Sequence, residues 1–407
     1  MKISQKAKQA ILIGSLCSLS YFAVYIARNI LGAVTPLMLE DPAYTKDYIS
    51  WISSLYFSFY AFGQLINGLV GERIPAKWMI CIGLLGAGVT NFVFSTVTLI
   101  PAAAMIAYGF TGLFLSMIYG PMTKVVAENT EPIYATRCSL GYTFASFFGS
   151  PVAGLLALFL SWRGVFNVSS IAMLAMSALC FLGFTAFERK KIIQYGKYKP
   201  KEKVAGNVKV LFRHQIVKFS LISILTGIIR TSVVFWLPTY LNEYLLFTEE
   251  QSISIYSAST LVMAMTTFMA VFVYERLGRN MDLTILIMFI SSSVFFVLTY
   301  FVKHPVLNII FIVLAIMTTA GAASMMWTRY CPGLRDTGMV SSVTGFLDFL
   351  SYMAAAAANV IFAKAATALG WSNLILVWLA LAVCGIVLAL PYRKFFKKKE
   401  PPSELSA

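Results

Sequence analysis

Two arginines lie inside long apolar segments, where a permanent charge is energetically unfavourable and indicates a function. Arg28 is within VYIARNILGAVTPLML and Arg230 is within IRTSVVFWLPTYL. Arginine stays protonated at every relevant pH, and a charged residue at the centre of a membrane span costs about 2.5–3.5 kcal/mol on insertion scales. Because a guanidinium group matches phosphate oxygens in a two-bonded fork, two arginines without a matching pair of acids indicate an anion site.

The two arginines occupy equivalent positions in two halves of the chain. Each precedes a proline by eight residues, Pro36 or Pro238, and the offset between the halves is 202 residues. Two short charged turns, GERIPAK and YERLGRN, repeat at an offset of 203. Repeats of this kind bind substrate near the middle of the bilayer, where the repeats meet. The alternative is structural, with each arginine bonded to backbone carbonyls or to Asp348.

Tyrosines share the helical face of the first arginine. Tyr21, Tyr25 and Arg28 are spaced at i, i+4 and i+7, which places them on one side of a helix. Their hydroxyl groups can donate to phosphate oxygens or to sugar hydroxyls, or the rings can simply pack. The pattern favours a binding role for Tyr25 and is neutral for Tyr21.

Asp348 is the only acidic residue in the interior of a predicted span, within TGFLDFLSYMAAAAAN. Tyr352 follows it at i+4 on the same face. Three roles for the carboxylate are compatible with the sequence: an ion pair with Arg230 or Lys124, a carrier of protons, or a ligand for a cationic group or hydroxyl of a substrate. The alanine run after it permits close helix approach.

Further candidates carry less specific signals. Gln64 can hydrogen-bond a ligand, and Trp236 can line a substrate path or pack. Lys124, near the inner end of the fourth span, can reach a ligand or extend to the membrane surface. The charged turns are interpreted as inner-face gates that lock one conformation, formed by Glu72, Arg73, Glu275 and Arg276.

The elements that must position these residues are membrane spans. Of the 407 residues, 59% are hydrophobic and 12% are charged, with a mean hydropathy of +0.77, whereas soluble domains carry about 25% charged residues. A helix needs about 20 apolar residues to cross a bilayer. Twelve such segments are predicted, so the expected fold is all-α and integral to the membrane: 10–36, 49–70, 79–99, 102–125, 138–160, 164–187, 219–240, 252–274, 282–302, 306–328, 338–363 and 372–392.

The distribution of charge predicts the topology. The formal net charge is +15, and most basic residues fall in alternate loops, ten of them in the tract 188–218. Since cytoplasmic loops are enriched in Lys and Arg, both termini are expected to be cytoplasmic. The charge indicates topology and contact with anionic lipid, not a nucleic-acid partner. The predicted units are an N-terminal six-helix bundle at 1–187, a cytoplasmic linker at 188–218, a C-terminal six-helix bundle at 219–392 and a cytoplasmic tail at 393–407.

Cysteine and histidine give no sign of a metal site or of a disulfide. The six cysteines fall in predicted spans or on the inner side, and the two histidines, His214 and His304, lie in predicted loops. The sequence contains neither a Cys/His cluster with metal-ligand spacing nor a P-loop motif. We therefore expect no cofactor, no metal ion and no enzymatic activity.

The turn after the second span resembles a signature of the major facilitator superfamily. Gly68, Glu72, Arg73 and Lys77 match its order of a glycine, an acid, an arginine and further basic residues. This resemblance implies twelve transmembrane helices in two pseudo-symmetric six-helix bundles, the major facilitator fold.

A narrower resemblance is to the organophosphate:phosphate antiporters. Tyr25 and Arg28 match their first-span pattern, and RTSVVFWLPTYLNE, which begins at Arg230, matches their seventh. The resemblance implies that the paired arginines bind a phosphoryl group. The chain departs from the bacterial hexose- and glycerol-phosphate carriers at Gln64, where those carriers usually have a lysine. Asp348 is similar to an aspartate of the sugar-phosphate exchanger branch.

The residues and the resemblance together predict a secondary transporter of the cell membrane, and we expect it to be monomeric. It would exchange a small organophosphate, either a sugar phosphate or a glycerol phosphate, for inorganic phosphate by alternating access. One alternative is a proton-coupled carrier of another organic anion that uses Asp348. The other is a membrane sensor that resembles a transporter.

Overall fold

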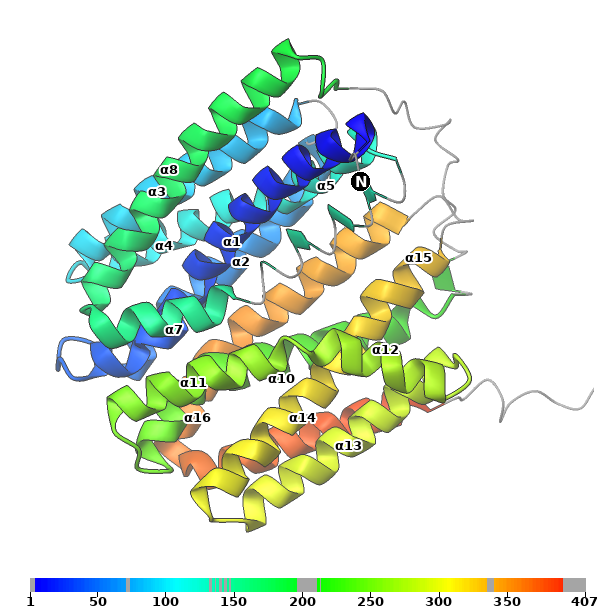
Figure 1. The fold of residues 1–407 in the computed structure, drawn as a ribbon. Helices are drawn as coiled ribbons and strands as arrows, with labels where there is room; N and C mark the ends of the chain where they lie inside the picture. The colour runs from blue at the N-terminus through cyan, green and yellow to red at the C-terminus, as the bar shows by residue number, and fades with distance from the viewer. Residues whose placement is uncertain are drawn as a thin grey trace, which may run out of the picture.

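The computed structural model describes residues 4–70, 74–131, 134–135, 137–138, 141–142, 145, 148–195, 211–212, 214–334 and 340–390. Within these ranges the chain forms helices and no strand (Figure 1). Nine stretches of this described part are long and apolar enough to cross a membrane. The expectation of an all-helical membrane protein is confirmed.

The helices of the first half follow the predicted spans, with one break. The fourth predicted span is divided because Pro121 lacks an amide hydrogen and its ring clashes with the carbonyl of the residue four positions earlier. The fifth predicted span lies partly outside the described residues, and α7 forms its second half. The helices are α1 (Gln5–Leu39), α2 (Lys46–Val70), α3 (Ala76–Val97), α4 (Pro101–Ser116), α5 (Tyr119–Asn129), α7 (Gly149–Phe159) and α8 (Trp162–Arg189).

The helices of the second half contain a comparable break in the eighth span. The hydroxyl of Thr266 donates to the carbonyl of Met263 at 2.6 Å, and such a side-chain bond competes with the helical pattern. The elements are α10 (Ile216–Glu243), α11 (Glu249–Met263), α12 (Thr266–Arg276), α13 (Met281–Phe301), α14 (Pro305–Met325), the π-helical turn η1 (Met326–Tyr330), α15 (Cys331–Gly333) and α16 (Val340–Ala389).

The element α16 contains two predicted spans joined end to end. Its 50 residues would extend about 75 Å as one straight helix, more than twice the thickness of the hydrocarbon core. Gly370 interrupts it with φ of +77°, a backbone conformation that glycine adopts without steric cost. The chain reverses there, and the two parts of α16 run back through the protein (Figure 1).

The two halves meet chiefly along three helix pairs: α2 with α16, α7 with α11, and α1 with α10. In the first pair, the side-chain amide of Asn359 on α16 donates to the hydroxyl of Ser53 on α2 at 2.8 Å, and both residues are buried. Figure 1 shows the halves close together where α7 and α11 meet. They diverge toward the end that carries the N-terminus, α5 and α15.

Three residues join the halves at the closed end, and we call them the closing cluster. Lys46, the first residue of α2, forms a salt bridge with Glu243, the last residue of α10. The indole N–H of Trp371, just after the reversal in α16, donates to the same carboxylate at 2.9 Å. The Lys46 ammonium also lies 5.6 Å from the centre of the Trp371 ring. The charged side chains are only 21% and 32% exposed, so solvent and salt screen this pair less than a surface pair.

Replacing Glu243 with glutamine is expected to open the closed end more often. A hydrogen bond to a charged group contributes about 1.5–3 kcal/mol, so its loss should shift the conformational equilibrium about tenfold. The shift toward the open state would be measured by the rate of labelling with a membrane-impermeant thiol reagent. The reagent is applied on the side of the membrane where the closing cluster lies. The reporter is Ser150→Cys in a variant without native cysteines, because Ser150 lines the cavity behind the closing cluster.

The matched control for this experiment is Lys303→Met. The Lys303 ammonium donates to the hydroxyl of Tyr244 at 2.7 Å, a contact between two residues of the second half. Equal labelling of the Glu243→Gln and Lys303→Met variants would contradict a gating role for the closing cluster.

Candidate functional site

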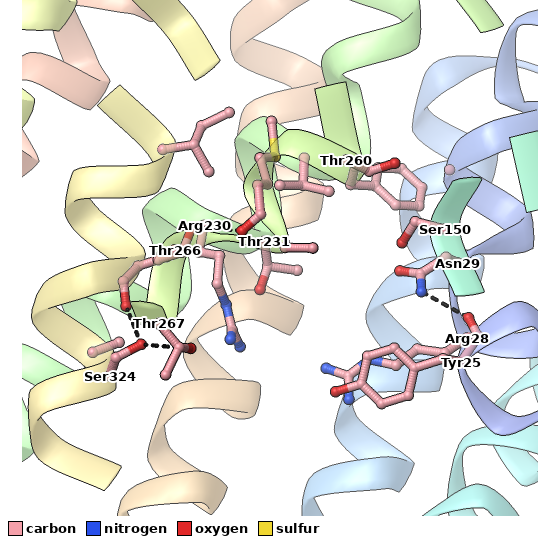
Figure 2. A pocket seen from close by; sticks show the side chains of 18 of the residues that line it. Tyr25, Arg28, Asn29, Ser150, Arg230, Thr231, Thr260, Thr266, Thr267 and Ser324 are labelled. Atoms are coloured by element: carbon pink, nitrogen blue, oxygen red, sulfur yellow. Dashed lines mark hydrogen bonds between the residues drawn. The ribbon is translucent and has the colours of Figure 1, made fainter. Parts of the chain in front are cut away.

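A cavity of about 280 Å³ lies between the two halves, near the middle of α1 and α10 (Figure 2). Its wall comes mainly from α1, α10, α11, α12 and α14, with single residues from α2, α7 and η1. The polar lining residues come from both halves: Tyr25, Arg28, Asn29, Ser150, Arg230, Thr231, Tyr256, Thr260, Thr266, Thr267 and Ser324.

Aromatic side chains hold the guanidinium of Arg28 in place. One of its nitrogens donates to the hydroxyl of Tyr352 on α16 at 2.7 Å, which joins the two halves beside the cavity. The guanidinium carbon lies 5.5 Å, 5.2 Å and 4.9 Å from the ring centres of Tyr25, Tyr60 and Tyr352. Contacts with aromatic faces stabilise a cation without neutralising it, so the site keeps a net positive charge.

Arg230 reaches the cavity from the opposite side. Figure 2 shows the guanidinium groups of Arg28 and Arg230 pointing into the space between the halves. Within the described part of the chain, Arg230 forms no hydrogen bond and no salt bridge, and neither arginine is paired with a carboxylate. The structural alternative bonds each arginine to backbone carbonyls or to Asp348. This conformation does not show those bonds among the described residues.

Asp348 lies near both arginines without bonding to either. Its carboxylate interacts electrostatically with Arg230 and, more weakly, with Arg28, and its side chain is partly buried on α16. Among the residues that the structure describes, it has no hydrogen-bond partner and no salt bridge with Arg230. The acid thus moderates the positive field of the cavity but leaves both guanidinium groups free to bind an anion.

The other expected binding residues lie away from the cavity wall. Tyr21 packs with the rings of Tyr25 and Tyr119, 4.9 Å and 5.3 Å away between ring centres. Trp236 is 1% exposed, so the structure places it in the core behind the wall. Gln64 and Lys124 are partly buried and outside the lining set.

The expected inner gates are described only in the second half. Glu72 and Arg73 lie outside the described residues. Glu275 and Arg276 end α12, are exposed, and form no salt bridge with any residue the structure describes. The Arg276 guanidinium lies over the ring of Phe272, 5.2 Å from its centre. The gating role of these turns stays a prediction.

The sequence patterns did not indicate most of the hydroxyl groups in the cavity. Ser150, Thr231, Thr267 and Ser324 line it, but serine and threonine are common in apolar helices. The available signal was the pair of threonines in MAMTTF, next to the break between α11 and α12. Irregular backbone at membrane depth occurs only where it is buried in protein or lines a cavity.

A model of the Major Facilitator Superfamily matches residues 17–359. The chain belongs to the Major Facilitator Superfamily. The fold agrees: a bacterial homolog of the human lysosomal transporter Spinster, solved inward-facing and unoccupied, superposes with a TM-score of 0.74 over 98% of this chain and 100% of that one, at 13% identity. A D-xylose-proton symporter superposes with a TM-score of 0.71 over 95% and 97%, at 11% identity.

Sequence relatives of this superfamily member include carriers of phosphorylated compounds. It is 23% identical to the glycerol-3-phosphate transporter of Bacillus subtilis over 58% of each chain. It is 22% identical to the phosphoglycerate transporter protein of Salmonella typhimurium over 87% of this chain and 82% of that one. A match to the membrane sensor protein UhpC of Salmonella typhimurium, at 28% identity, spans 22% of this chain and only 20% of that protein.

These findings confirm the resemblance to organophosphate carriers and the expected major facilitator fold. The superfamily member is a multi-pass membrane transporter and not an enzyme. The match to the glycerol-3-phosphate transporter covers little more than half of that relative's length. The substrate of this chain and the ion or solute that drives its transport are therefore proposed below.

Proposed function

We propose that this transporter exchanges a small organophosphate, a sugar phosphate or a glycerol phosphate, for inorganic phosphate. The observation that carries the proposal is the pair of guanidinium groups, Arg28 and Arg230, that face one cavity and pair with no carboxylate in the described part of the chain. A phosphoryl dianion neutralises two fixed positive charges, and each guanidinium can form a two-bonded fork with phosphate oxygens. The names of the relatives support the same class of substrate.

Alternating access follows from how the halves contact one another. The closing cluster seals one end of the cavity, and the helices diverge toward the other end. We propose that the units 1–187 and 219–392 rock about the bound phosphoryl group, joined by the linker 188–218. With both termini cytoplasmic, the present conformation opens inward in the cell membrane. The protein acts as a monomer in the lipid bilayer.

Exchange in liposomes tests this function. Purified protein is placed in vesicles loaded with labelled inorganic phosphate, and glycerol 3-phosphate, glucose 6-phosphate or inorganic phosphate is added outside. We expect outside substrate to release the label and its absence to leave the label inside. Failure of every compound in this set to release the label would overturn the proposal.

A second candidate is a proton-coupled carrier, because Asp348 lies near both arginines and has no bonded partner among the described residues. If the protein is an exchanger, Asp348→Asn should keep phosphate exchange within a few-fold of the unsubstituted rate, since the acid does not bind the dianion. An uncoupler should leave both proteins unaffected. Uptake that an uncoupler abolishes, with a pH dependence that Asp348→Asn removes, would favour the proton-coupled carrier instead.

A further inference from the structure

The cavity has a second polar region beside the arginine pair. Thr267 of α12 and Ser324 of α14 bring their hydroxyl oxygens within 3.5 Å of each other. Figure 2 shows both residues on the same side of the cavity as Arg230. We call Thr266, Thr267 and Ser324 the hydroxyl wall; all three line the cavity and come from two helices of the second half.

Two hydroxyls of the hydroxyl wall donate their hydrogens to helix carbonyls. Ser324 donates to the carbonyl of Ala320 at 3.0 Å, and Thr266 donates to Met263 at 2.6 Å. Since a hydroxyl has one hydrogen and that of Ser324 points to Ala320, Thr267 is the group left to donate across the long 3.5 Å contact between Thr267 and Ser324. Each oxygen retains lone pairs, so the wall offers mainly acceptors to the cavity.

A wall of hydrogen-bond acceptors favours a ligand that carries hydrogen-bond donors. A fully ionised phosphoryl group offers only acceptors, so the wall does not match it, and the arginines supply the donors it needs. A ligand hydroxyl carries a hydrogen to donate and matches the wall. The cavity of about 280 Å³ is close to the lower limit of about 300 Å³ for pockets that enclose small organic molecules, so the organic part beside the phosphoryl group should be small, such as a short polyol or a sugar.

We infer that the hydroxyl wall, through Thr267 and Ser324, recognises hydroxyl groups of the organic part of the substrate, so that the site selects hydroxylated organophosphates over alkyl phosphates. This inference rests on the proposed function, because it takes the arginines to hold the phosphoryl group. It places the phosphoryl end of the ligand at the two arginines and the hydroxyl-bearing end at Thr267 and Ser324.

Equilibrium binding to the purified full-length protein tests the inference apart from transport. Glycerol 3-phosphate and propyl phosphate differ in two hydroxyl groups but share a three-carbon chain and a phosphate. We expect the unsubstituted protein to bind glycerol 3-phosphate about tenfold more tightly, since its two hydroxyl groups allow two hydrogen bonds that propyl phosphate cannot form. In Thr267→Val with Ser324→Ala, the preference should fall to about twofold or less, while affinity for inorganic phosphate stays unchanged.

Two controls separate recognition from packing. Thr267→Ser keeps the oxygen and should keep the preference. Thr318→Val removes a hydroxyl of α14 that bonds to Leu314 and lies outside the lining set, so it should change no affinity. If the double variant does not fold, Thr267→Val alone carries the test, with a smaller expected loss of preference.

The outcomes are distinct for the inference and for the proposed function. Equal binding of glycerol 3-phosphate and propyl phosphate by the unsubstituted protein overturns the hydroxyl wall and leaves phosphate exchange intact. Equal weakening of all ligands in the double variant, inorganic phosphate included, also overturns it, because the substitutions would then act through the structure of the site. Absence of binding by every phosphate compound overturns the proposed function and this inference together.

Discussion

Replacing Arg28 or Arg230 with lysine is expected to lower phosphate exchange at least a hundredfold, although the charge is kept. Lysine carries a point charge and cannot form the planar two-bonded fork with a phosphoryl group. A hundredfold loss corresponds to about 2.7 kcal/mol, within the range for hydrogen bonds to charged groups. At position 28 the contacts with the rings of Tyr25, Tyr60 and Tyr352 would also be disrupted.

The measurement is the initial rate of label release from phosphate-loaded liposomes. Arg163→Lys is the matched control, because Arg163 stacks on Trp162 with 4.6 Å to the ring centre and does not line the cavity. Full exchange by a protein that carries both Arg28→Lys and Arg230→Lys would show that the pair does not bind the phosphoryl group.

Gly227→Ala is expected to disrupt the site through packing alone. Gly227 lies one turn before Arg230, where α10 and α16 pack closely. An added Cβ would be 2.5 Å from the hydroxyl oxygen of Ser351 and 2.6 Å from its carbonyl oxygen. The backbone oxygen cannot rotate away, so the helices must separate, and such overpacking costs about 1–3 kcal/mol. We expect exchange to fall about tenfold or more and the apparent Tm to decrease.

Gly345→Ala in α16 is the control for this prediction. A Cβ at Gly345 would meet no described atom within 4 Å, and alanine favours a helix over glycine by about 1 kcal/mol. We expect this variant to keep the exchange rate of the unsubstituted protein and to have an equal or slightly higher Tm. Similar losses in the two variants, measured by exchange and by thermal unfolding in detergent, would contradict the close-packing explanation.

Much of the fold could be predicted because each membrane span appears in the sequence as a continuous run of apolar residues. Each predicted span that lies within the described residues corresponds to helix. The breaks were harder to predict, since Pro121 gives a recognisable signal but the break before Thr266 does not. The reversal at Gly370 was expected only as a gap between two apolar runs, and the backbone there shows why it occurs.

The site was predicted unevenly for a related reason. Arg28 and Arg230 stand out because a charge in an apolar helix is rare and costly, and both line the cavity; their binding role stays a prediction. Trp236 shared a motif with Arg230 but lies in the core. A motif gives the identity of neighbouring residues, while the side of the helix that meets a cavity depends on its partners.

The sequence by itself determined the membrane-spanning class, the duplicated arrangement and the presence of two arginines inside apolar spans. Hydrophobic run length and the cost of a buried charge are local properties of the chain, so they can be read without a structure. Only the tertiary structure decided which distant residues meet. Lys46 and Glu243 are 197 residues apart in the closing cluster, and Thr267 and Ser324 are 57 apart in the hydroxyl wall. The physical reason is that helical periodicity specifies a face within one helix, whereas packing between helices specifies what that face contacts.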